Sequence, residues 1–292
     1  MTIELVKEKK RYKEKFKAIC QKFLKTRNSS YFLKTHSKAI DFLIKKLRLD
    51  TVRSNNISLI ATGGYGREEL FPYSDIDFLI FYDGVLDSKS KEMISLFIAS
   101  CWDSGLTIGH SVRNTKEVKE EFLADITTAT NLIESRLITG SNKVFKKFDE
   151  VIKKSLSIKK FYKEKNEEQL TRHKKFNESA YQLEPNIKES PGGLRDMHMT
   201  RWISSSQHKG NTFLEMHKSG LIDKKEYETI RFHENNVSKL RILLHILSKS
   251  IDDRLVFDVQ NKLAKALGYI SKDNKKSSEI LMKKYYKSVN YI

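Results

Sequence analysis

The chain has 292 residues, with 55 Lys and Arg against 37 Asp and Glu, so its formal net charge is +18 at pH 7. Apolar residues make up 39% of the chain and aromatic residues 10%, which is enough for a packed core and excludes wholesale disorder. No apolar stretch approaches the roughly 18 residues of a membrane span, and the first residues lack the apolar region of a signal peptide. Two cysteines cannot form a disulfide framework. This composition predicts a soluble, cytoplasmic protein without a membrane partner.

The positive charge is a diffuse lysine excess. The chain has 42 Lys but only 13 Arg, and the lysines are spread along its whole length. Arginine is the residue that matches phosphates and base edges with its planar fork. The charge therefore argues against a nucleic-acid partner, although an acidic protein or a triphosphate ligand is compatible with it.

The spacing of apolar residues predicts helices, then a few strands, then helices again. In the first part of the chain we expect helices at 4–26, 35–48 and 88–103, and strands at 57–62, 76–82 and 106–112. After residue 115 every periodic segment is predicted to be helical, at 127–138, 142–154, 158–177, 195–208, 223–250, 258–267 and 276–289. The fold class is therefore α+β, with a small mixed sheet near the N-terminus and an all-α region after it.

The segment most informative about chemistry follows the first predicted strand. The strand runs into Gly63-Gly64, a short helix is expected near Arg67, and the second strand carries Asp75 and Asp77 at its start. Residues i and i+2 of a strand point to the same face, so the two carboxylates project together and favour a hard cation such as Mg²⁺. A glycine pair lets backbone N–H groups approach a phosphate closely. Each element alone is a weak signal, but their combination predicts a nucleotidyl-transfer site.

The string GGYGREELFPYSDIDFLIF, from residue 63, resembles the DNA-polymerase-β-like nucleotidyltransferase superfamily and, within it, the bacterial PII uridylyltransferases of nitrogen signalling. Other segments share this resemblance, namely WDSGLTIGHSVRNTKE at 102–117, ATNLIESRLITG at 129–140, YQLEPNIKESPGGLRDMHMTRWI at 181–203 and LRILLHILSKSIDDRLVFDVQNKLAKALGY at 240–269. The resemblance implies an N-terminal helix at 1–24, a polymerase-β-like nucleotidyltransferase domain at 25–145 and a helical domain of PII-uridylyltransferase type at 146–292.

The resemblance also implies a reaction and a set of site residues. UMP is transferred from UTP to a tyrosine hydroxyl of the PII regulatory protein, and pyrophosphate is released. Asp75 and Asp77 are implied as catalytic residues that hold Mg²⁺, and Gly63 and Gly64 as the phosphate cradle. We expect Arg67 to contact phosphate, with a surface ion pair as the alternative. Ser74 is expected either to hold phosphate or to cap its turn.

A second loop, at 184–195, concentrates two of the three prolines and two adjacent glycines. Lys188 and Arg195 give this loop fixed positive charge, and Asp196 is a candidate cap for the helix that follows. We expect Lys188 and Arg195 to contribute to nucleotide binding from the helical domain. The alternative is a packing turn in which Arg195 pairs with a carboxylate.

The sequence departs from the resembled families in two respects. Many superfamily members carry a third carboxylate on a neighbouring strand, but residues 106–112 contain none, and His110 lies there instead. No histidine is followed by Asp, so the sequence offers no uridylyl-removing HD domain. Two alternatives therefore stay open, namely a nucleotidyltransferase that acts on another protein or on RNA, and a truncated, non-catalytic relic that binds nucleotide.

Overall fold

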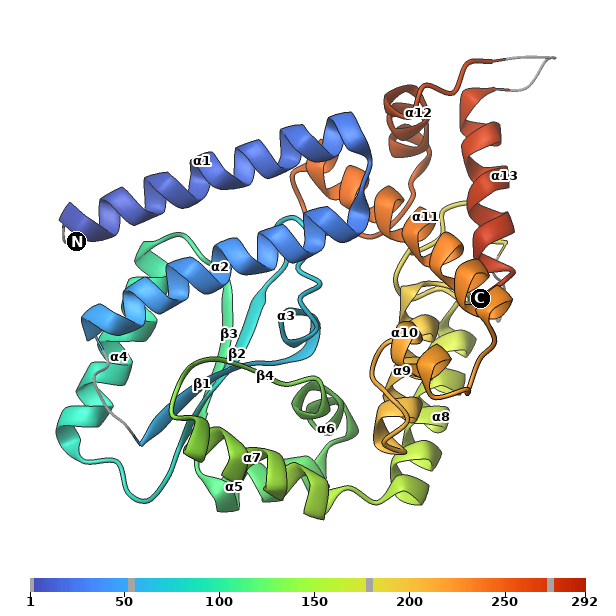
Figure 1. Ribbon diagram of the computed structural model, residues 1–292. Helices are drawn as coiled ribbons and strands as arrows, with labels where there is room; N and C mark the ends of the chain where they lie inside the picture. The colour runs from blue at the N-terminus through green and yellow to red at the C-terminus, as the bar shows by residue number, and fades with distance from the viewer. Residues whose placement is uncertain (1–2, 52–55, 177–180, 272–275) are drawn as a thin grey trace. The chain divides into compact units, whose positions relative to one another are not determined.

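The computed structural model describes residues 3–51, 56–176, 181–271 and 276–292 (Figure 1). The chain forms two compact units, Met1–Leu156 and Ser157–Ile292. The first unit begins with two long helices, α1 (Ile3–Thr26) and α2 (Ser29–Thr51). None of the described helices is both long and apolar enough to cross a membrane.

The first unit is built on a four-stranded mixed sheet in the order β3-β2-β1-β4. Its strands are β1 (Ile57–Ala61), β2 (Ile76–Tyr82), β3 (Ile108–Arg113) and β4 (Arg136–Gly140). β1 lies antiparallel to β2 and β4, whereas β2 and β3 are parallel. The predicted α+β class, with a small mixed sheet and many helices, is confirmed.

Helices cover both faces of this sheet (Figure 1). Leu59, Phe78 and Ile80 point into a core formed with α2 and α4 (Ser88–Asp103). The alternate residues Leu79 and Phe81 point into a second core, because successive strand residues face opposite sides. The second core is formed with α5 (Thr115–Ala124), α6 (Ile126–Ile133) and α7 (Asn142–Ser155).

The prediction of a single helix over 127–138 is wrong at its end. Helix α6 stops at Ile133, and β4 begins at Arg136 and pairs with β1. A short apolar run such as Leu137–Thr139 fits a helix or a strand equally well by its spacing, and the free hydrogen-bonding edge of β1 decides the outcome. The first compact unit ends after α7, which packs on the sheet. The domain boundary at 145/146 stays a prediction of the sequence analysis.

The second unit is entirely helical within the ranges that the structure describes. It consists of α8 (Ile158–Lys175), α9 (Leu194–Ser206), α10 (Phe213–Lys218), α11 (Lys224–Ser248), α12 (Phe257–Ala266) and α13 (Ser277–Val289). All of these except α10 match predicted helices within about two residues, which is the usual uncertainty of helix ends. The α10 helix has only six residues, too few for a periodic pattern.

Candidate active site

The candidate site lies where β1 ends and β2 begins. Because the two strands are antiparallel and adjacent, the residues after Ala61 lie beside the residues before Phe78. The backbone N–H of Thr62 donates a hydrogen bond to the carbonyl oxygen of Asp77 at 3.0 Å. The glycine turn and the aspartate segment, which the sequence separates by about ten residues, are thus held together by the sheet itself.

The two aspartates differ in their surroundings. Asp75 immediately precedes β2 and is exposed, whereas Asp77 is partly buried within the strand. Asp77 pairs with Gly109 of the parallel strand β3. A Cβ atom at position 109 would lie 2.2 Å from Oδ1 of Asp77. Gly109 therefore makes the room that the Asp77 carboxylate occupies, a role that the sequence analysis did not find because it depends on the register of β3.

The glycine pair opens helix α3 (Gly63–Gly66), which starts earlier than the helix expected near Arg67. Gly63 has a φ of +55°, a left-handed conformation that favours glycine. Gly64 has ordinary φ, and a Cβ there would meet nothing closer than Arg67 Nη2 at 3.7 Å. Thr62 gives no side-chain cap to the first N–H groups of this turn. Those N–H groups are the donors that a phosphate would use.

Gly66 has a structural task that the sequence analysis did not assign. A Cβ at this position would lie 1.6 Å from the carbonyl oxygen of Glu134. The backbone of α3 can therefore approach the end of α6 only because residue 66 has no side chain. This contact fixes the position of the glycine turn relative to the sheet.

Arg67 lies in an ion-pair network. Its Nε is 2.8 Å from Oε2 of Glu69, and its Nη1 pairs with Glu134. The arginine side chain is 12% exposed, so it is largely enclosed by these carboxylates. Arg67 thus forms an enclosed ion pair, and not the surface ion pair given as the alternative. A phosphate contact by Arg67 stays a prediction.

The loop between Arg67 and Asp75 is anchored from α2. Leu70 donates its N–H to Ser37 Oγ at 3.3 Å, and its carbonyl oxygen lies 3.0 Å from Nδ1 of His36. Burial lowers the pKa of His36 to about 4, so the ring is neutral at pH 7. Ser74 donates its backbone N–H to the Phe71 carbonyl and closes the turn before Asp75. Neither of the roles expected for its hydroxyl is tested by this geometry.

A buried polar triad holds α3 from its other side. The Tyr65 hydroxyl donates to Oδ1 of Asp41 at 2.6 Å. Arg136 of β4 binds the same carboxylate with two hydrogen bonds of 2.8 and 3.0 Å and lies over the Tyr65 ring. A bidentate pair of this kind has one preferred geometry. The triad joins α2, α3 and β4 and so positions the glycine turn.

The structure gives His110 no place beside the aspartates. His110 pairs with Phe78 of β2, and its ring contacts Phe78 and Trp102. Phe78 faces the opposite side of the sheet from Asp77, because neighbouring strand residues alternate. Across the described ranges, no group of three or more His, Cys, Asp and Glu side chains is arranged to hold a metal. Asp75 and Asp77 therefore stay predicted metal ligands.

The second predicted loop lies in the second unit. Arg195 pairs with Glu189 at 3.0 Å and lies 5.5 Å from the centre of the Trp202 ring. Lys188 is 3.6 Å from the same glutamate. Burial lowers the pKa of Lys188, and the nearby positive charges of Arg195 and Arg241 lower it further. The pairing of Arg195 with a carboxylate, which the sequence analysis gives as the alternative, is present in the structure. Nucleotide binding by Lys188 and Arg195 stays a prediction.

Backbone packing fixes the path of this second loop. A Cβ on Gly192 would lie 2.1 Å from the Val289 carbonyl oxygen, and Gly192 has a φ of +74°. Asp196 accepts a 2.7 Å hydrogen bond from the N–H of Gly192 and also binds Arg172 and His173. Helix α9 is preceded by Gly193, so Asp196 lies inside the first turn instead of capping it. The carboxylate orders the loop from within the helix.

The base of the loop rests on a second buried carboxylate. Ile187 donates its N–H to the Asp253 carbonyl, and the Asp253 side chain binds Arg241 at 2.7 and 2.9 Å and His245 at 2.8 Å. Burial acts to raise the pKa of Asp253, but His245 and Arg241 outweigh it and lower the value to about 2. Asp253 is thus ionised at neutral pH.

Comparison with known proteins agrees with this geometry. A family profile described as "Nucleotidyltransferase domain" matches residues 44–191, which include β1, α3 and β2 with both glycines and both aspartates. The chain belongs to the nucleotidyltransferase family. A second profile, described as "GlnD PII-uridylyltransferase", matches residues 160–292 of the helical unit. The resemblance drawn from the sequence is therefore confirmed.

Relatives of this nucleotidyltransferase share one name, bifunctional uridylyltransferase/uridylyl-removing enzyme. The protein of Nitrosospira multiformis is 38% identical over 278 residues, which cover 93% of this chain and 31% of the relative. The protein of Cupriavidus metallidurans is 38% identical over 85% of this chain, and that of Cupriavidus pinatubonensis is 40% identical over 78%. These alignments cover 29% and 26% of the two relatives. The chain thus spans less than a third of the length of the curated relatives it matches.

Proposed function

We propose that this nucleotidyltransferase transfers UMP from UTP to a tyrosine hydroxyl of a PII signalling protein in the cytoplasm. The observation that carries the proposal is the hydrogen bond from the Thr62 N–H to the Asp77 carbonyl oxygen, which holds the start of the glycine turn beside the strand that carries Asp77. Similarity to named uridylyltransferases across 93% of the chain supports the choice of UTP and PII over other substrates.

The residues at the junction fit a magnesium ion. Mg²⁺ uses one or two protein carboxylates and completes its shell with water and substrate phosphates, so a pair of aspartates is sufficient. The absent Cβ of Gly109 leaves the space that the Asp77 carboxylate occupies, and the side chain of Asp75 is exposed. When bound, Mg²⁺ supplies charge neutralisation for the triphosphate and for the departing pyrophosphate.

The proposed reaction requires the protein to orient two reactants, UTP and the acceptor tyrosine. The phenolic oxygen of the acceptor attacks the α-phosphorus of UTP and forms a new P–O bond, while the bond to the bridging oxygen of the β-phosphate breaks. Pyrophosphate leaves, and the phenolic proton passes to solvent. The first N–H groups of α3 would hold the triphosphate, and Asp75 and Asp77 would hold the metal. Most of the rate enhancement in such transfers comes from this positioning and from electrostatic stabilisation.

Three cationic side chains are proposed to assist with the phosphates. Arg67 follows the glycine turn directly, and Lys188 and Arg195 belong to the second loop. In each case a triphosphate would compete with the carboxylates that now pair with the side chain, Glu69 and Glu134 for Arg67 and Glu189 for the loop. Bidentate contact with phosphate is a general property of the guanidinium group.

Incubation with α-labelled UTP, purified PII and Mg²⁺ tests the function. We expect label on PII, dependence on the divalent metal, and little transfer from ATP or onto RNA. Transfer from ATP, or onto RNA in place of PII, would support the other nucleotidyltransferase alternative. Binding of UTP without transfer to any acceptor would support the non-catalytic one.

Removing either carboxylate should abolish the reaction. We expect Asp75→Asn and Asp77→Asn to fold normally and to lose at least about a hundredfold in transfer rate, since a metal contributes several kcal/mol to such steps. Asp83→Asn is the matched control, because Asp83 follows the other end of β2 and pairs with Lys147 on the surface. Normal turnover by either site variant would exclude this site assignment.

A further inference from the structure

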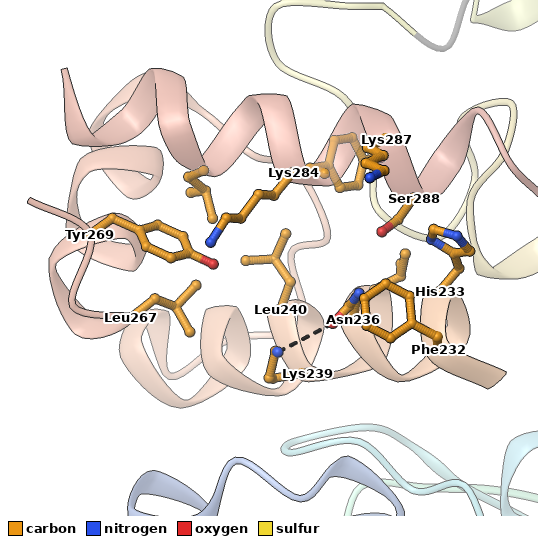
Figure 2. Close-up of a pocket in the computed structure, with 13 residues that line it drawn as sticks. Phe232, His233, Asn236, Lys239, Leu240, Leu267, Tyr269, Lys284, Lys287 and Ser288 are labelled. Atoms are coloured by element: carbon orange, nitrogen blue, oxygen red, sulfur yellow. Dashed lines mark hydrogen bonds between the residues drawn. The ribbon is translucent and has the colours of Figure 1, made fainter. Parts of the chain in front are cut away.

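The helical unit contains a cavity of about 330 Å³ that the proposed reaction does not use. It lies between α11 and α13, with residues that follow α12 at one end (Figure 2). Its lining includes the apolar side chains of Phe232, Val237, Leu240, Leu267 and Leu281. The volume is at the lower end of the range of small-molecule sites, about 300–1,000 Å³.

The charge around this cavity has one sign. Three lysines and no carboxylate occur among its thirteen described lining residues. Lys284 extends from α13 toward Tyr269, with Nζ 4.2 Å from the centre of the ring (Figure 2). Lys239 lies on α11, 3.3 Å from Asn236 Oδ1. An apolar cavity rimmed by cations favours an anionic group on an apolar body.

Two buried polar atoms of the lining have no hydrogen-bond partner in the described structure. They are Nδ1 of His233 and the hydroxyl of Tyr285, whose residues are only 6% and 4% exposed. The face of the His233 ring is covered by Tyr291, 4.6 Å away between centres. A buried polar group without a partner costs about 1–3 kcal/mol, so native proteins rarely leave one unsatisfied. A ligand in the cavity would supply the missing partners.

We propose that this cavity binds a small organic anion whose apolar or aromatic body lies among Leu240, Leu267 and Tyr269. Its carboxylate or phosphate is held by Lys284, and its polar atoms bond to His233 and Tyr285. The proposal does not rest on the transferase reaction, because none of the site residues described above lines the cavity.

Binding can be measured with 8-anilinonaphthalene-1-sulfonate, an aromatic anion whose fluorescence rises in apolar surroundings. We expect saturation at one probe per chain and displacement by decanoate. N-phenyl-1-naphthylamine, which has the same aromatic body without the sulfonate, should bind at least about tenfold more weakly, because it lacks the charged partner for the lysines. Several probes per chain, or equal binding of the neutral compound, would overturn the proposal.

Reversing the charge of one lining lysine tests whether the probe binds in this cavity. Lys284→Glu should weaken binding of the anionic probe at least about tenfold. Lys283→Glu is the matched control, because Lys283 is the neighbouring exposed lysine of α13 and lies outside the lining. Equal effects of the two variants would mean that the probe binds the general positive surface, and the proposal would fail.

Tyr285→Phe separates a binding role from a structural one. Removing an unsatisfied hydroxyl should leave the thermal stability of the ligand-free protein unchanged or raise it, because no hydrogen bond is lost. The same change should weaken probe or decanoate binding several-fold, since the ligand loses a partner. A lower melting temperature together with unchanged affinity would show that the hydroxyl serves the fold and would count against the ligand site.

Discussion

Gly109 illustrates how a single missing Cβ shapes the proposed active site. We predict that Gly109→Ala folds but transfers UMP at least about a hundredfold more slowly, because the new methyl group would lie 2.2 Å from Asp77 Oδ1 and force the carboxylate to rotate away. The new methyl group would clash with the end of the Asp77 side chain and not with the backbone, so the free energy of unfolding should change little. Thermal melting and the transfer assay measure both effects.

Ser111 supplies the control for that experiment. It lies two residues further along β3 and pairs with Leu79, so it occupies the same face of the strand. Ser111→Ala should keep wild-type transfer. If Gly109→Ala is fully active, Asp77 does not need its present position, and its assignment as a metal ligand is contradicted.

We expect two glycines of the turn to have different roles, with Gly64 facing the nucleotide and Gly66 serving the packing of the fold. Gly64→Val should fold, because its Cβ would meet only ordinary contacts, yet bind UTP more weakly, because the side chain keeps phosphate away from the backbone. Gly66→Ala should instead destabilise the protein by about 2 kcal/mol or more, because its Cβ would overlap the Glu134 carbonyl oxygen. Calorimetric titration with UTP and denaturant unfolding distinguish the two. Unchanged UTP affinity in folded Gly64→Val would contradict the cradle.

At the scale of elements, the loop that leads to Asp75 depends on a neutral histidine. The Leu70 carbonyl can only accept, so Nδ1 of His36 donates to it and Nε2 accepts from the Tyr12 hydroxyl. The pKa of His36 is about 4 in the folded protein and about 6.5 in an unfolded chain. Between these values only the unfolded state binds the proton, so stability falls as the pH decreases through this range.

We predict that His36 contributes about 2 kcal/mol to the loss of unfolding free energy between pH 7 and pH 5. Denaturant unfolding at both pH values should show this part of the loss disappearing in His36→Gln. His110→Gln is the control, since His110 is an exposed histidine of the same unit. The same pH dependence in wild type and His36→Gln would contradict a buried, neutral His36.

The sequence is sufficient to predict those features of the fold and the candidate site that depend on the local pattern of residues. The sequence predicts β1, β2 and the spacing from Gly63 to Asp77, because two runs of β-branched and aromatic residues flank a glycine turn. The sequence does not reveal that Gly66 faces Glu134, because this contact depends on how α3 packs against the end of α6. It does not reveal that Gly109 faces Asp77 either, because that contact depends on which strands become neighbours. For the same reason the sequence does not predict β4, because residues 136–140 form a strand by pairing with the edge of β1.

At the scale of the whole molecule, the residues predicted to bind nucleotide are distributed over the two compact units. The metal-binding pair and the glycine turn belong to Met1–Leu156, whereas Lys188 and Arg195 belong to Ser157–Ile292. The net charge of +18 would favour the approach of any triphosphate, but it does not distinguish one lysine from another. The distinction comes from local surroundings, because Lys188 is half-buried next to Arg195 and Arg241, where an anion would relieve repulsion.

We therefore predict that Lys188→Ala weakens UTP binding about tenfold while the protein stays folded, because a positive charge directed at phosphate is lost from a desolvated position. Lys224→Ala is the control, since Lys224 belongs to the same unit and pairs with Glu228 on the surface. Calorimetric titration with UTP, checked by thermal melting, measures the effect. If folded Lys188→Ala binds UTP as wild type does, the second loop serves only to shape the helical unit, and the nucleotide is held by the first unit alone.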